Sequence, residues 1–255
     1  MSSIRLAKLA MIPLLLLGLA ACANTAKLQE QAGSHIQIGS AYLHSAQYTA
    51  ALKEFLAAEK LTPDDHHVHY LLGISYYGKG LPDMAIAEFK RALVLKPDDT
   101  EAYNYLGAIY MEKGRWDDAI GAFNQSLSNI LNETPSTPLY NLGRAYYEKR
   151  EYDRALAYFR EAAAKDPQGS LMILIEKNIG MCLYAKGETE EALRHFQKSV
   201  ALAPSFVESH YWIGMSYQKL RRRADAAAAF QNAIRLGPDS EFGRKAKESL
   251  RSLAP

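Results

Sequence analysis

The chain has 255 residues, enough for one elongated domain or two small globular ones, and 48% of them are hydrophobic, so a substantial core can form. Lys and Arg number 30 against 28 Asp and Glu, which gives a formal net charge of +2. The excess comes from Arg5 and Lys8, because the chain from residue 22 onward has 30 − 2 = 28 basic residues and 28 acidic ones. A neutral chain does not have the basic balance of nucleic-acid-binding proteins, so we expect no nucleic-acid partner.

Residues 1–21 resemble the signal peptide of a bacterial lipoprotein. A positively charged start precedes an apolar stretch, Leu9–Leu19, which is shorter than the ~20 residues that span a bilayer. The stretch ends in LAAC at residues 19–22, which matches the lipobox pattern L-[AS]-[GA]-C. The resemblance implies cleavage before Cys22, attachment of lipid to its sulfur and anchoring that several acyl chains make stable. Because Ala23 rather than Asp follows, we expect a protein of the bacterial outer membrane that faces the periplasm.

Two other interpretations of this start remain open. It could be an ordinary signal peptide followed by a chance cysteine, or an anchor that is not cleaved. If Cys22 is lipidated, residues 22–31 are expected to be a flexible tether with a reach on the order of 17 Å, which would keep the following domain close to the membrane.

A glycine recurs every 34 to 37 residues from residue 39 onward. Twelve residues after each glycine comes an alanine, and four residues later a phenylalanine, without exception. The glycines are Gly39, Gly73, Gly107, Gly143, Gly180 and Gly214, and the phenylalanines are Phe55, Phe89, Phe123, Phe159, Phe196 and Phe230. A period of about 34 residues with these positions is typical of tetratricopeptide (TPR) repeats, each a helix–turn–helix unit.

The segment 32–239 therefore resembles a TPR array, and it predicts an all-α fold, a right-handed TPR superhelix (α-solenoid). The repeats are expected at residues 32–65, 66–99, 100–133, 136–169, 173–206 and 207–240, followed by a capping helix at 240–255. In each repeat we expect the glycine of the first helix (helix A) and the alanine of the second (helix B) to let the two backbones approach closely. A solenoid needs such end caps because each unit contacts only its neighbours.

The residues that could carry chemistry do not form a catalytic constellation. The densest group is His66, His67 and His69, where His69 falls in a packing position and no Cys, Asp or Glu completes a site, so we expect no metal. Cys182 falls inside helix A of the fifth repeat and is expected to be a small buried residue. The run 221–223 of three arginines lies in a turn, where it is either solvated or in contact with an anionic lipid or acidic partner. We therefore expect no enzyme, no cofactor and no small-molecule substrate.

The phase of the repeats predicts which helix A residues line the concave groove that TPR arrays use for partners. The predicted groove residues are Tyr70, Ile74, Tyr77, Asn104, Met111, Tyr140, Arg144, Tyr147, Lys177, Met181, Tyr184, Tyr211 and Met215. Tyr and Met supply adaptable apolar contact area, and a Lys/Asn/Arg clamp for a C-terminal carboxylate is absent. We expect a protein partner with an apolar or amphipathic segment. The alternative is that several of these residues are simply core between repeats.

A lipobox, a short tether, six TPR repeats and a capping helix together resemble the type IV pilus pilotins, the PilF/PilW/Tgl family. Residues 135–139, which interrupt the array after the third repeat, look like that family's own insertion. The resemblance implies an outer-membrane lipoprotein that assists localisation and assembly of a type IV pilus secretin, with the secretin subunit as partner. The chain lacks the cysteine pair that some members carry. The alternative is a general TPR lipoprotein that scaffolds another cell-wall or outer-membrane assembly complex.

Overall fold

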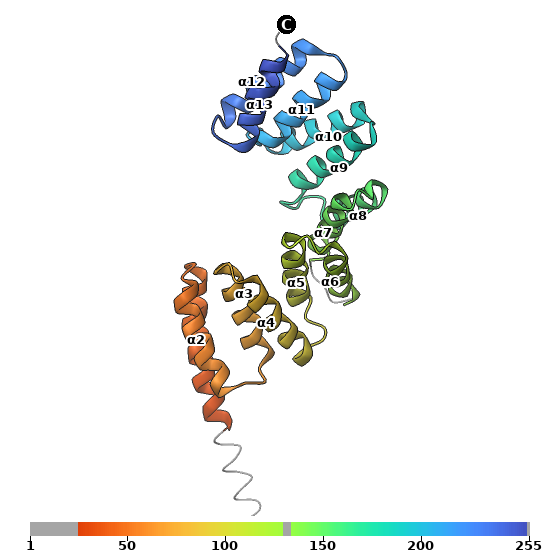
Figure 1. The fold of residues 1–255 in the computed structure, drawn as a ribbon. Coiled ribbons are helices and arrows are strands. Elements are labelled where there is room, and N and C mark those ends of the chain that lie inside the picture. Colours follow the sequence, from red (N-terminus) through yellow and green to blue (C-terminus); the bar gives the residue numbers. More distant parts are fainter. Residues whose placement is uncertain (1–24, 130–133, 254–255) are drawn as a thin grey trace, which may run out of the picture. The chain divides into compact units, whose positions relative to one another are not determined.

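The computed structural model describes residues 25–129 and 134–253 of the protein. Within these ranges all regular structure is helical and there is no strand, so the all-α prediction is confirmed. Residues 25–44 form the first helix, and the helices that follow are α2 (Tyr48–Leu61), α3 (His66–Gly78), α4 (Pro82–Leu95), α5 (Thr100–Glu112), α6 (Trp116–Ser128), α7 (Ser136–Glu148), α8 (Tyr152–Lys165), α9 (Met172–Lys186), α10 (Thr189–Leu202), α11 (Val207–Lys219), α12 (Arg223–Leu236) and α13 (Glu241–Ser252) (Figure 1).

The chain divides into two compact units, unit 1 at Met1–Ile109 and unit 2 at Tyr110–Pro255. In unit 1 the helix at 25–44 shares a core with α2 and α3, and α3 pairs with α4. In unit 2 the pairs are α7 with α8, α9 with α10, and α11 with α12, and helix B of one repeat contacts helix A of the next. This is the helix A–helix B order that the repeats predict.

The first helix begins earlier than the sequence analysis expects. Residues 25–31, which we assigned to a flexible tether, are helical. The reason is local, because Ala, Lys, Leu, Gln and Glu fill this stretch and all are good helix formers. The predicted signal peptide and the lipidation site at Cys22 lie outside the described residues.

Five of the repeat glycines, Gly39, Gly73, Gly143, Gly180 and Gly214, make room for a phenylalanine ring. This differs from the close contact of two backbones that we expected. A methyl group added at Gly180 would lie 2.6 Å from the ring of Phe196, and one added at Gly143 would lie 2.6 Å from Phe159. The phenylalanines of all six repeats are completely buried, with 0% of their surface exposed. The glycine and the phenylalanine are therefore one packing unit, and burial of the ring contributes about 1.5–3 kcal/mol to each helix pair.

The turn between helix A and helix B places one residue in the left-handed region in every repeat. Glycine occupies this position in three repeats, but Ala46, Arg150 and Arg221 have φ values of 54°, 61° and 60°. Left-handed backbone costs a residue with a Cβ roughly 1–2 kcal/mol. The turn geometry thus recurs even where the residue does not favour it.

The C-terminal end of unit 2 is covered by α13, which contacts both α11 and α12. Ser240 caps this helix by accepting a hydrogen bond from the Gly243 amide at 3.0 Å. Ala246, within the same helix, is fully buried. Among the described residues no helix combines the length and the apolar character that a transmembrane segment requires.

Candidate partner-binding surface

The predicted groove residues belong to helix A of successive repeats, where helical spacing turns them to one face. Ten of them are half-buried, as expected for residues that line a surface between helices: Tyr70, Ile74, Tyr77, Asn104, Tyr147, Lys177, Met181, Tyr184, Tyr211 and Met215. Arg144 is exposed.

Two predicted groove residues are buried and need correction. Met111 is 7% exposed and Tyr140 is 8% exposed, so neither offers much surface to a partner. The phase of the repeat gives the direction of a side chain but not how far neighbouring helices close over it. Met111 is a core residue, and Tyr140 contributes to a site only through its ring edge and its hydroxyl.

In unit 1 the helix A residues of the second and third repeats form an aromatic surface. Tyr70 stacks on His67 with ring centroids 6.2 Å apart, and its hydroxyl donates a hydrogen bond to Glu101 Oε2 at 3.0 Å. Burial raises the pKa of Tyr70, and the Glu101 carboxylate raises it further, so this hydroxyl stays a donor. Tyr105 contacts Tyr70 and Tyr77 edge-on, at 5.9 and 6.5 Å. The sequence analysis missed Tyr105.

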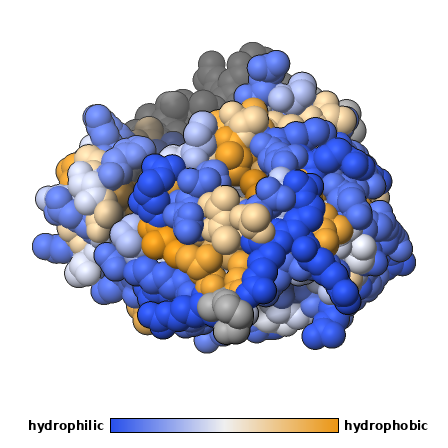
Figure 2. Space-filling view, turned by 90° about the horizontal axis from the view of Figure 1, so that it is seen from above, coloured by the Kyte–Doolittle hydropathy of each residue, from blue (hydrophilic) through white to orange (hydrophobic). Residues whose placement is uncertain are grey.

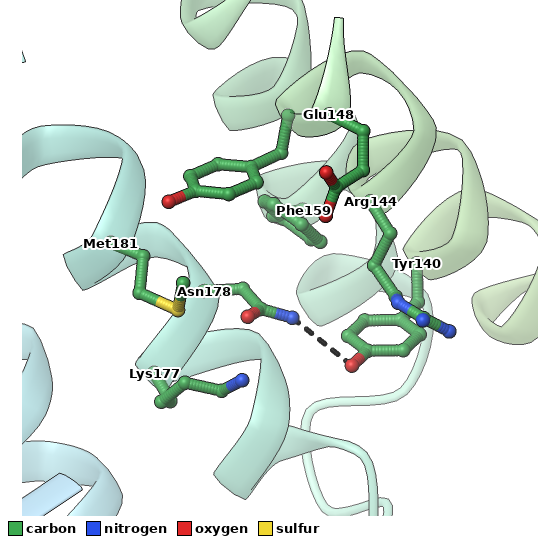
Figure 3. A pocket seen from close by; sticks show the side chains of 8 residues that line it. Tyr140, Arg144, Glu148, Phe159, Lys177, Asn178 and Met181 are labelled. Atoms are coloured by element: carbon green, nitrogen blue, oxygen red, sulfur yellow. Dashed lines mark hydrogen bonds between the residues drawn. The ribbon is translucent and has the colours of Figure 1, made fainter. Parts of the chain in front are cut away.

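In unit 2 the helix A residues of the fourth and fifth repeats enclose a pocket of about 250 Å³. Its walls come from α7, α8 and α9 (Figure 3). The lining residues are Tyr140, Arg144, Tyr147, Glu148, Phe159, Lys177, Asn178 and Met181. Five of these eight were predicted from the repeat phase, and the structure brings them together around one cavity. Glu148, Phe159 and Asn178 were missed.

The pocket combines an apolar interior with a polar rim. Asn178 Nδ2 donates to the Tyr140 hydroxyl at 3.0 Å, which fixes both side chains (Figure 3). The Arg144 guanidinium lies 5.9 Å from the centre of the Tyr140 ring. Burial is also the main cause that raises the pKa of Tyr147, to about 12, so its hydroxyl is neutral at physiological pH. Four aromatic or thioether side chains line the cavity beside four polar or charged ones, which favours an amphipathic segment of a partner.

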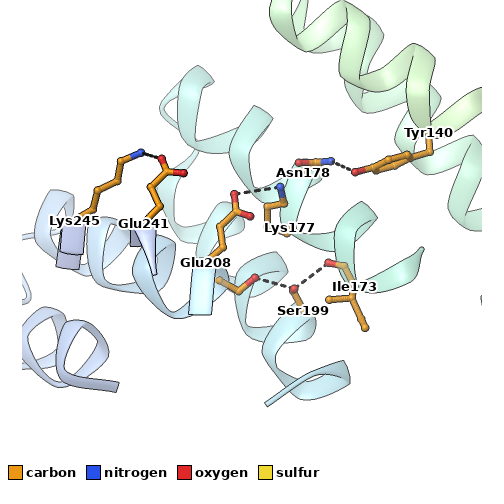
Figure 4. A network of polar contacts seen from close by, with 9 residues as sticks. Tyr140, Ile173, Lys177, Asn178, Ser199, Glu208, Glu241 and Lys245 are labelled. Atoms are coloured by element: carbon orange, nitrogen blue, oxygen red, sulfur yellow. Dashed lines mark hydrogen bonds and ion pairs between the residues drawn. The ribbon is translucent and has the colours of Figure 1, made fainter. Parts of the chain in front are cut away.

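Polar contacts between helices tie the repeats of unit 2 together behind this pocket (Figure 4). Lys177 Nζ donates to Glu208 Oε1 at 3.2 Å across the fifth and sixth repeats, with side chains only 12% and 18% exposed. Ser199 Oγ donates to the Ile173 carbonyl at 2.9 Å and lies 2.8 Å from Ser209 Oγ. Lys177 is therefore held by an ion pair, and its role on the surface is to position its neighbours.

Aromatic side chains extend the surface toward the C-terminal end of unit 2. The Trp212 ring lies 5.5 Å from both Tyr184 and Tyr211, and Tyr211 lies 5.5 Å from Phe242. The Trp212 indole nitrogen is buried and has no hydrogen-bond partner in the described part of the chain. Viewed onto this end of the molecule, apolar residues gather at the centre and hydrophilic ones surround them (Figure 2).

Two predictions about isolated reactive residues have clear outcomes. Cys182 is 0% exposed, and burial raises the pKa of its thiol to about 12, which confirms that it is an unreactive core residue. For His69, we expected that no acidic residue would complete a site, and the structure differs. Glu59 and Glu88 lie beside it, because they are close in space although 10 and 19 residues away in sequence. In the turn of the sixth repeat, Arg222 pairs with Asp225 at 2.8 Å.

The repeat geometry defines a class of protein, and sequence comparison identifies the same one. Family models described as tetratricopeptide repeats match residues 36–100, 98–168, 180–220 and 207–240. The chain belongs to the tetratricopeptide-repeat proteins, whose arrays serve as scaffolds for protein partners.

Solved structures with the same fold include PilF and PilW. PilF of Pseudomonas aeruginosa is 18% identical, with a TM-score of 0.74 over 88% of this chain and 99% of that one. PilW, described as a widely conserved type IV pilus biogenesis factor, is 19% identical, with a TM-score of 0.75 over 84% of this chain and 97% of that one. YrrB, a TPR protein with an unusual peptide-binding site, is 23% identical, with a TM-score of 0.59 over 76% and 97%. At these identities the likeness concerns the fold. A search of curated protein sequences gives no significant match.

Proposed function

We propose that this chain is a non-catalytic, pilotin-like lipoprotein that assists outer-membrane localisation and assembly of a type IV pilus secretin. The observation that carries the proposal is the pocket of unit 2, which offers both aromatic and charged side chains to an amphipathic partner segment. The fold shared with PilF and PilW, the latter described as a pilus biogenesis factor, supports the choice of system.

The pocket suits one side chain of a protein better than a free metabolite. Its volume of about 250 Å³ is below the range of about 300–1,000 Å³ typical of small-molecule sites. A large apolar side chain from an extended or helical segment would contact Tyr147 and Met181, while Arg144 and Glu148 at the rim would meet polar groups of the same segment. The lipid on Cys22 would then carry the bound subunit to the outer membrane.

The surface is tested by binding of the purified chain to secretin subunits. Met181→Ala removes apolar contact area from the pocket and should weaken binding by about tenfold, the scale of an anchor residue. The matched control is Leu202→Ala, which removes a side chain that is 53% exposed outside the pocket and should leave binding unchanged. Equal affinities for wild type and Met181→Ala would show that the pocket is not part of the binding surface.

The role in the cell is tested by deleting the gene, then blotting for secretin multimers and assaying twitching motility. Loss of multimers supports the proposal, whereas normal multimers and motility reject it. If envelope assembly fails in another system instead, the general scaffold is the correct function. The anchor is tested separately by Cys22→Ala, which should leave the solenoid folded but displaced from the outer membrane. Unaltered outer-membrane fractionation of that variant rules the anchor out.

A further inference from the structure

Both ring nitrogens of His69, a residue only 5% exposed in α3, face hydrogen-bond acceptors. Nε2 lies 2.9 Å from the carbonyl oxygen of Pro63, and Nδ1 lies 2.8 Å from Glu88 Oε2. A carbonyl oxygen can only accept, so Nε2 carries a hydrogen. In the neutral ring this leaves a lone pair on Nδ1, directed at a carboxylate.

A second carboxylate joins this pair. One oxygen of Glu59 in α2, one ring nitrogen of His69 and one oxygen of Glu88 in α4 all lie within 4.8 Å of one another. The pKa of Tyr76 is raised first by burial and then by Glu88 and Glu59, so this phenol also lies near both carboxylates. Three electron-pair donors thus converge from three helices of unit 1. Their mutual repulsion favours a cation among them.

Two other His–Glu pairs at the same repeat positions do not have this arrangement. His35 Nδ1 lies 2.7 Å from Glu54, and His195 Nδ1 lies 2.6 Å from Glu176. In the described part of the chain neither ring has an acceptor on Nε2, so a neutral ring with its hydrogen on Nδ1 satisfies each glutamate. Neither pair is part of a three-ligand group in that part of the chain. The arrangement around His69 is therefore specific to the second repeat.

We propose that Glu59, His69 and Glu88 bind a divalent metal ion of the zinc class. One imidazole nitrogen and two carboxylate oxygens are a ligand set that zinc accepts, with water completing the shell. The hydrogen bond from Nε2 to the Pro63 carbonyl is the contact that usually orients a metal-binding histidine. Ligands about 2.0–2.2 Å from zinc lie closer together than 4.8 Å, so Glu59, which is half-buried, would move inward.

The bound ion would connect α2, α3 and α4. These helices belong to two repeats that the His69–Pro63 hydrogen bond and an ion pair between Arg91 and Asp64, at 2.9 Å, already join. The metal would add a further link and stiffen the N-terminal unit. A ligand that binds only the folded state stabilises it in proportion to its concentration.

The test is calorimetric titration of the purified full chain with Zn²⁺, followed by thermal unfolding with and without EDTA. We expect one tightly bound Zn²⁺ that raises Tm, with EDTA reversing the rise. Glu59→Gln keeps the His69–Glu88 contact and should weaken Zn²⁺ binding by at least about tenfold. The matched control, Glu176→Gln, removes the glutamate of the fifth-repeat pair and should bind Zn²⁺ as the wild type does.

Two outcomes would overturn the proposal. One is Zn²⁺ binding that is absent or is the same in Glu59→Gln and wild type, which would assign any bound metal to surface histidines. The other is a His69 ring that holds two hydrogens, observed by ¹⁵N NMR, in the presence of excess Zn²⁺. In that case the cation among the three groups is a proton.

Discussion

The second repeat (residues 66–99) and the fifth (residues 173–206) are built on the same apolar interior. A methyl group added at Gly73 would lie 2.8 Å from the Phe89 ring, and the corresponding distance from Gly180 to its phenylalanine is 2.6 Å. These distances leave no room for any side chain. The contact between glycine and phenylalanine is therefore fixed by packing and recurs in both repeats.

The polar positions of the same two repeats differ. Helix A carries the histidine and helix B the glutamate in the second repeat, at His69 and Glu88, whereas the fifth repeat reverses them as Glu176 and His195. A single His–Glu contact forms equally well whichever helix carries the histidine. In the second repeat, unlike the fifth, the Pro63 carbonyl and a further glutamate, Glu59, also lie beside the histidine. Differences at polar positions can therefore give repeats of the same fold different sites.

The largest expected effect tests whether the two interiors are equivalent. Phe89→Ala and Phe196→Ala should each lower the free energy of unfolding by about 3–5 kcal/mol, because each empties a fully buried aromatic site. Urea unfolding followed by circular dichroism measures the loss, with Leu202→Ala as an exposed control. A loss below about 1 kcal/mol in only one of the two repeats would show that their interiors are not equivalent.

An intermediate effect is expected from exchanging the partners of each polar pair. The double variant Glu176→His/His195→Glu restores a His–Glu contact and should change stability by less than about 1 kcal/mol. His69→Glu/Glu88→His instead places a carboxylate against the Pro63 carbonyl and should cost about 1–3 kcal/mol, since two buried acceptors then face each other. Urea unfolding of both double variants without added metal compares the two costs. Similar values would mean that Pro63 imposes no constraint.

The smallest effect concerns the turn between the helices. The second and fifth repeats use Gly80 and Gly187 at the left-handed position, with φ of 72° and 90°, whereas the fourth uses Arg150 at 61°. Arg150→Gly should therefore raise the free energy of unfolding by up to about 1 kcal/mol, the strain relieved less the entropy that glycine loses. Thermal unfolding of this variant beside Gly187→Ala, which should be less stable than wild type, provides the check. A destabilised Arg150→Gly would show that the arginine side chain has a compensating contact.

Much of the candidate surface followed from the repeat phase, and the exceptions have physical causes. Tyr147 and Met181 face the pocket as predicted because helical spacing fixes their direction. Met111 was wrongly assigned to the surface, and Tyr140 lines the pocket but is more buried than expected, because the degree of burial depends on how closely the next repeat packs. Asn178 was missed because its role depends on a hydroxyl 38 residues earlier in the chain.

The sequence by itself determined the class of fold, the recurring positions of the glycines and phenylalanines and the direction of most helix A side chains. These follow from a local rule, a helical period repeated in every unit, so no long-range information is needed. Only the tertiary structure decided which side chains close into a pocket and that Glu59, His69 and Glu88 converge. Those contacts join different helices, and their distances depend on how neighbouring repeats pack, which no spacing within one repeat specifies.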